Sequence, residues 1–114
     1  MKRVSYAGET FLTADDTADA LVHLTAALGR AQNAQVVELP TVDALGRHQI
    51  VLLVVGPASQ LVATPEESIY EEPESSAIVA ELVARTQAMR SNYSQALTSQ
   101  GAISDYDLDE LDQP

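Results

Sequence analysis

One run of seven residues, QIVLLVV over residues 49–55, constrains the fold more than any other part of the chain. A tight turn precedes it and Gly56-Pro57 ends it, so we interpret it as a β-strand. Side chains alternate between the two faces of a strand, which puts Leu52 and its alternate neighbours on one face and Leu53 on the other. Because both faces are apolar, the pattern predicts an interior strand of a sheet covered on both sides.

Two other segments predict its neighbours in the sheet. Residues 4–6 and 10–13 are β-prone and meet at Gly8, which can adopt the positive φ of a tight hairpin. Residues 35–42 predict a strand that pairs antiparallel with 49–55 through a turn at Gly46. Pro40 cannot donate to a ladder, so this strand lies at an edge or turns Pro40 away from its partner. The second neighbour of residues 49–55 must then come from the N-terminal hairpin or from residues 60–63.

Two helices are predicted from capping and periodicity. Thr13 stands at the N-cap position of the first, acidic residues follow it, and Gly29 ends it. The second begins near Pro73, ends near Gly101, and is expected to be amphipathic. Its apolar stripe consists of Ile78, Leu82, Met89, Tyr93 and Ala96. At about 1.5 Å per residue this helix outruns the sheet, which favours contact with a second copy or another protein.

Together these elements predict an α+β fold. We expect a small antiparallel-rich sheet of four to five strands with one packed helix, a long second amphipathic helix and an acidic tail. The sheet core occupies residues 1–64, an acidic linker 65–73, a helix packing on the core or a partner 74–99, and a disordered acidic tail 100–114.

Charge and composition narrow the classes of function. Seventeen acidic residues against six basic ones give a formal net charge of -11. This charge repels phosphate backbones and anionic lipids, so neither nucleic acid nor membrane is an expected partner. The chain has no cysteine, which excludes disulfides and thiolate chemistry, and no window approaches the ~20 apolar residues of a membrane span. We expect a soluble, cytoplasmic protein.

No catalytic or metal-binding motif is visible. The spacing of Asp105, Asp107 and Asp109 opens like an EF-hand loop, but Glu110 stands where that loop needs Gly. His23 and His48 have no sequence neighbours at metal-ligand or catalytic spacing. We therefore predict no enzyme, no cofactor and no metal.

The leading hypothesis is a small acidic protein–protein interaction protein, an adaptor or regulator, that forms a homodimer or binds another protein. Its expected partner-binding residues are Leu82, Met89, Tyr93, Tyr106, Leu108 and Leu111. One alternative is an acidic inhibitor or antitoxin-like protein that covers a basic surface. Another is a small-molecule binder or enzyme with a pocket between sheet and helix, which would need a polar cluster around Arg47, His48 and Ser59.

Overall fold

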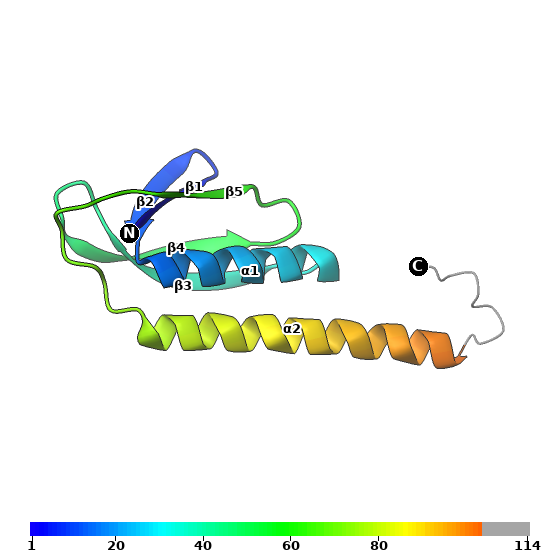
Figure 1. The fold of residues 1–114 in the computed structure, drawn as a ribbon. Helices are drawn as coiled ribbons and strands as arrows, with labels where there is room; N and C mark the ends of the chain where they lie inside the picture. Colours follow the sequence, from blue (N-terminus) through cyan, green and yellow to red (C-terminus); the bar gives the residue numbers. More distant parts are fainter. Residues whose placement is uncertain (104–114) are drawn as a thin grey trace.

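The computed structural model describes the backbone of residues 1–103 and the side chains of residues 1–91. Its elements are β1 (Lys2–Tyr6), β2 (Glu9–Thr13), α1 (Asp15–Ala31), β3 (Gln35–Val42), β4 (His48–Val55), β5 (Leu61–Pro65) and α2 (Ser76–Ile103). The five strands form one antiparallel sheet in the order β4-β3-β2-β1-β5 (Figure 1). The predicted α+β class is confirmed.

The position of β4 contradicts the prediction of an interior strand. Among the strands of residues 1–103 its only neighbour is β3. Neither the N-terminal hairpin nor residues 60–63 supply the expected second neighbour, because β5 pairs with β1 instead. Leu53 is 8% exposed, whereas Leu52 is 66% exposed. Residues 49–55 are apolar on both faces, as in a strand that is covered on both sides, but this fold covers only the face that carries Leu53.

The sheet consists of two parts joined at one point. β1 pairs along its length with β2 and β5, and β3 pairs with β4 through eight consecutive residue pairs. Between β2 and β3 the only paired residues are Leu12 and Val42. β3 is therefore not an edge strand, and Pro40 lies where the ladder with β2 has already ended. Thr13 Oγ1 donates a hydrogen bond of 2.7 Å to the carbonyl of Pro40 and so links the two parts there.

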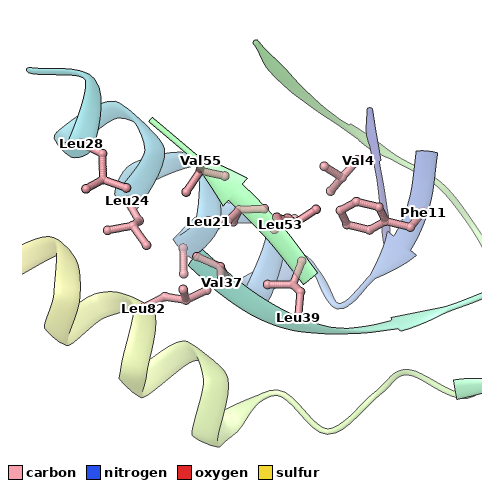
Figure 2. Close-up of a cluster of buried hydrophobic side chains, with 12 residues drawn as sticks. Val4, Phe11, Leu21, Leu24, Leu28, Val37, Leu39, Leu53, Val55 and Leu82 are labelled. Atoms are coloured by element: carbon pink, nitrogen blue, oxygen red, sulfur yellow. The ribbon is translucent and has the colours of Figure 1, made fainter. Parts of the chain in front are cut away.

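Both helices contribute to the core on the sheet face that carries Leu53. Figure 2 shows Leu21, Leu24 and Leu28 of α1 gathered with Val37, Leu39, Leu53 and Val55, and Leu82 of α2 joining them. Val4 and Phe11 from the N-terminal hairpin extend the same cluster. α2 thus belongs to the core through its first turns, and its later turns run past the end of α1 (Figure 1).

The turns follow the sequence more closely than the helix ends do. Gly8 has φ +84° between β1 and β2 and Gly46 has φ +83° between β3 and β4, as predicted, and Ala7 also has a positive φ. Thr13, however, is not the N-cap of α1, because Ala14 holds that position without a side-chain hydrogen bond. α1 also continues past Gly29 and ends at Ala31, where Gln32 takes the left-handed conformation.

α2 begins at Ser76 rather than near Pro73 and continues to Ile103, past Gly101. Its whole length has almost no apolar–polar asymmetry, in contrast to α1. In the predicted apolar stripe Leu82 is fully buried and Ile78 and Met89 pack against the core, while the side chains of Tyr93 and Ala96 lie outside the described residues.

Candidate functional site

The free edge of β4 is the most distinctive surface of the described residues. In an antiparallel strand, alternate residues direct their backbone N–H and C=O groups to opposite neighbours. The carbonyl of Val54 accepts a hydrogen bond from the Tyr6 hydroxyl, so the backbone N–H and C=O groups of Val54 are directed away from β3. By the same alternation Ile50 and Leu52 direct their backbone groups out of the sheet. These groups form no hydrogen bond among the described residues.

An apolar patch lies on the uncovered face of the same hairpin. We call it the outer patch; it consists of Val36, Ile50, Leu52 and Val54, which are 53%, 65%, 66% and 58% exposed. Val36 and Val54 are cross-strand partners, and Glu38 stands opposite Leu52. Covering these four side chains, each about 60% exposed, is worth about 4–7 kcal/mol at about 1.5–3 kcal/mol per fully buried side chain.

A hollow of about 460 Å³ lies beside the free edge. We call it the edge hollow. One wall is β4, with Gln49 and residues 51–54, and the other is the β1–β2 hairpin, with Tyr6, Ala7 and residues 9–11. Gln49, Val51 and Leu53 share the inner face of β4, so a strand added to this edge would direct alternate side chains into the hollow.

One end of the edge is already occupied. The Tyr6 hydroxyl binds the carbonyl of Val54 and lies 3.1 Å from Ser59 Oγ. Ser59 Oγ in turn accepts a hydrogen bond of 2.9 Å from the N–H of Gly56. The N-terminal hairpin and the loop after β4 therefore close the edge at Val54 and leave the segment around Ile50 open.

The other end is ordered by the turn between β3 and β4. The Asp43 carboxylate accepts hydrogen bonds from the backbone N–H of Leu45 and Arg47 at 2.8 and 2.9 Å, and from Arg47 Nε at 2.8 Å. The backbone N–H of Arg47 is the main reason why the pKa of Asp43 lies below its ordinary value. This network fixes Arg47 at the start of β4, where its side chain is 72% exposed.

The residues expected to bind a partner lie elsewhere. Leu82 is fully buried in the protein's own core, and Met89 packs partly against it, so contact with a partner through Leu82 would require α2 to leave the sheet. The side chain of Tyr93 and all of Tyr106, Leu108 and Leu111 lie outside the described residues. Their role in binding stays a prediction, and the site described here does not depend on it.

The polar cluster needed for a pocket enzyme is not assembled. Arg47 and His48 lie at the start of β4, and Ser59 lies beyond its far end, in the loop that precedes β5. His48 Nε2 contacts the carbonyl of Glu71 at 3.1 Å, while Ser59 contacts Tyr6. Within residues 1–103, no three His, Asp or Glu side chains are grouped as a metal site.

Comparison with known proteins adds no assignment. No family model, curated protein or solved structure matches this chain. Of the two helices described, neither combines the length and the apolar character that crossing a bilayer requires.

Proposed function

We propose that this chain is a protein-interaction module that works by strand addition at β4. An extended segment of another polypeptide pairs with the backbone of Ile50 and Leu52, and the outer patch and the edge hollow contact its side chains. The observation that supports the proposal most directly is the exposed edge of an eight-residue strand with apolar residues on both faces.

The sequence of β4 indicates that its free edge binds another polypeptide, because it lacks the features that protect an edge strand. Edge strands of proteins that stay monomeric are commonly protected by lysine, proline, a bulge or a covering segment. Residues 49–55 contain no charged residue and no proline, and the ladder between β3 and β4 runs without a bulge. Among the described residues, Tyr6 binds the backbone of this edge at the Val54 end, and Glu71 contacts the side chain of His48 at the other end. A free edge of this kind would promote aggregation unless a partner occupied it.

The energetics favour a strand over a helix as the occupant. Association costs about 4–15 kcal/mol in lost freedom, and even an occupant that covered the outer patch completely would gain only about 4–7 kcal/mol. Backbone hydrogen bonds along the edge, at about 0.5–1.5 kcal/mol each, supply the additional free energy. A helix has already used its backbone groups internally, so it cannot form these bonds along β4.

Site-specific photocrosslinking tests the proposal. A diazirine amino acid is placed at Leu52, or at Val83 on α2 as a control, because Val83 is also exposed, at 41%. We expect adducts from position 52 and few from position 83, and sequencing of the adduct should locate the crosslink in an extended segment. Equal yields from both positions, or no adduct at 52, would contradict strand addition at this edge.

A further inference from the structure

We propose that the strand added to β4 is β4 of a second copy of this chain, paired antiparallel about a two-fold axis at Ile50. This inference rests on the proposed function and names its partner. It makes the assembly a symmetric dimer in which two five-stranded sheets become one continuous sheet.

The charge distribution supports a second copy as the occupant. With a net charge of -11, two copies repel each other wherever their acidic surfaces meet. Residues 44–65, which include all of β4, contain no Asp or Glu. Two copies can therefore approach through β4 without bringing carboxylates together along the strand.

Repulsion between carboxylates also favours edge pairing over stacking of the two outer patches. Glu38 is exposed on β3 and stands opposite Leu52. If two outer patches stacked face to face, the two Glu38 carboxylates would enter an apolar contact, which is costly for unpaired charges. In an edge-to-edge dimer the β3 strands are separated by both copies of β4, so the two carboxylates stay in solvent.

The register follows from what already occupies the edge. Tyr6 holds the Val54 carbonyl, and Ser59 holds the N–H of Gly56. The open backbone segment therefore runs from His48, whose imidazole contacts the carbonyl of Glu71, to Leu52, and its centre is Ile50. Antiparallel pairing about this centre places Ile50 opposite Ile50 and His48 opposite Leu52 of the second copy, with up to about six backbone hydrogen bonds.

This register also creates a favourable charge contact. Arg47 precedes β4 and lies on the same inner face as Gln49, Val51 and Leu53, which alternate with it along the chain. In the proposed register Arg47 lies opposite Leu53 of the second copy. Leu53 and Glu9 both line the edge hollow, so Arg47 of one copy meets Glu9 of the other. Of the Arg47 guanidinium, Asp43 binds only Nε, and neither terminal amino group forms a hydrogen bond among the described residues, so both can bind Glu9. The two-fold axis produces this ion pair twice.

Engineered cysteines test the register, because the natural chain has no cysteine. Hydrogen-bonded partners in an antiparallel pair have Cα atoms about 5.5 Å apart, within the range that a disulfide spans. Under mild oxidation of the purified full chain, Ile50→Cys should give a disulfide-linked dimer. Leu52→Cys is the matched control, because residue 52 lies opposite residue 48 of the second copy, so its two cysteines are four residues apart along the strand and should not form a disulfide. Val83→Cys, on α2, measures disulfide formation by random collision.

Charge reversal tests the second contact independently. Glu9→Arg and Arg47→Glu should each raise the dimer dissociation constant by about tenfold, and the double variant should recover most of the loss. Sedimentation over a concentration series measures the constant, and thermal unfolding shows whether each variant is folded. Single variants as tight as the natural chain, or a double variant weaker than both, would overturn the Arg47–Glu9 contact and the register on which it depends.

The outcomes separate this inference from the proposed function. A disulfide that forms fastest at Leu52 would overturn the Ile50 centre but keep edge pairing. A chain that sediments at 12.2 kDa at every concentration, with no Ile50→Cys dimer, would overturn the second copy as the partner. If photocrosslinks at Leu52 then led to a different protein, the proposed function would still stand.

Discussion

Leu52 and Leu53 are consecutive residues with opposite environments. Leu53 lies on the inner face of β4 among core residues from α1 and β3, while Leu52 faces outward and is 66% exposed. From the sequence, either leucine could have been the core residue, because the two faces of β4 are equally apolar. Leu53 is the buried one because α1 and α2 pack apolar side chains against its face of the β3–β4 hairpin and not against the face of Leu52.

Alanine substitutions should separate the two leucines. Leu53→Ala should lower the free energy of unfolding by about 2–5 kcal/mol, because it opens a cavity in a packed core. Leu52→Ala should change it by no more than about 0.5 kcal/mol when measured in dilute solution. Urea unfolding of both variants at low concentration is the measurement. A large loss for Leu52→Ala under these conditions would mean that its side chain is covered even in a single copy.

At the scale of elements, the β3–β4 hairpin was predictable and its place in the sheet was not. The alternation of residues 35–42 and 49–55, with Gly46 between them, is local information, and it gave the pairing and the turn. The order β4-β3-β2-β1-β5 depends on the single backbone pairing of Leu12 with Val42 and on the Thr13–Pro40 hydrogen bond, which leave no trace in the local pattern. The candidate site was missed for the same reason, since a free edge is a property of strand order.

Helix ends were mispredicted where tertiary contacts overrode local signals. Thr13 is a good N-cap residue, but its hydroxyl binds the Pro40 carbonyl. Pro73 was expected in the first turn of α2, but it is buried and precedes the helix. Leu82 and Met89 were expected to face a partner because the stripe they form is apolar. The structure shows that the sheet and α1 already cover Leu82 completely.

The turn between β3 and β4 should respond to acid. Hydrogen bonds from Arg47 and Leu45 lower the pKa of Asp43 below its ordinary value of 3.8. A carboxyl group whose pKa is lower in the folded than in the unfolded protein stabilises the fold at pH values above its unfolded-state pKa. This stabilisation is lost as the pH falls through the folded-state pKa. Asp43→Asn should therefore lower the melting temperature at pH 7, and its difference from the natural chain should shrink as the pH falls below 3.8.

Melting curves of both proteins between neutral and acidic pH provide this measurement. Glu67→Gln is the control, because Glu67 forms no ion pair or hydrogen bond among the described residues and the melting temperature should not change at neutral pH. If Asp43→Asn stayed equally far below the natural chain at every pH, the effect would come from the shape of the side chain rather than its charge.

At the scale of the whole molecule, charge decides how a second copy can bind. Two bodies of charge -11 about 25 Å apart repel by about 20 kcal/mol in pure water. Salt at 0.1 M, with a screening length of about 10 Å, reduces this to about 1–2 kcal/mol, and salt near 1 M removes it. The repulsion that remains at 0.1 M salt is about as large as the contribution of the two exposed Arg47–Glu9 ion pairs, about 0.4–2 kcal/mol together.

Added salt should therefore not weaken the proposed dimer. Between about 0.1 and 0.5 M NaCl, screening removes about 1–2 kcal/mol of repulsion, which offsets the weakening of the two Arg47–Glu9 contacts, so the dissociation constant should stay the same or fall. An acidic inhibitor that covers a basic surface requires the opposite, because its attraction to the partner is screened. Sedimentation of the purified chain at several salt concentrations measures the constant directly. If the dimer dissociated as salt was added, attraction between opposite charges would be holding the copies together, and the uncharged edge of β4 could not be the main contact.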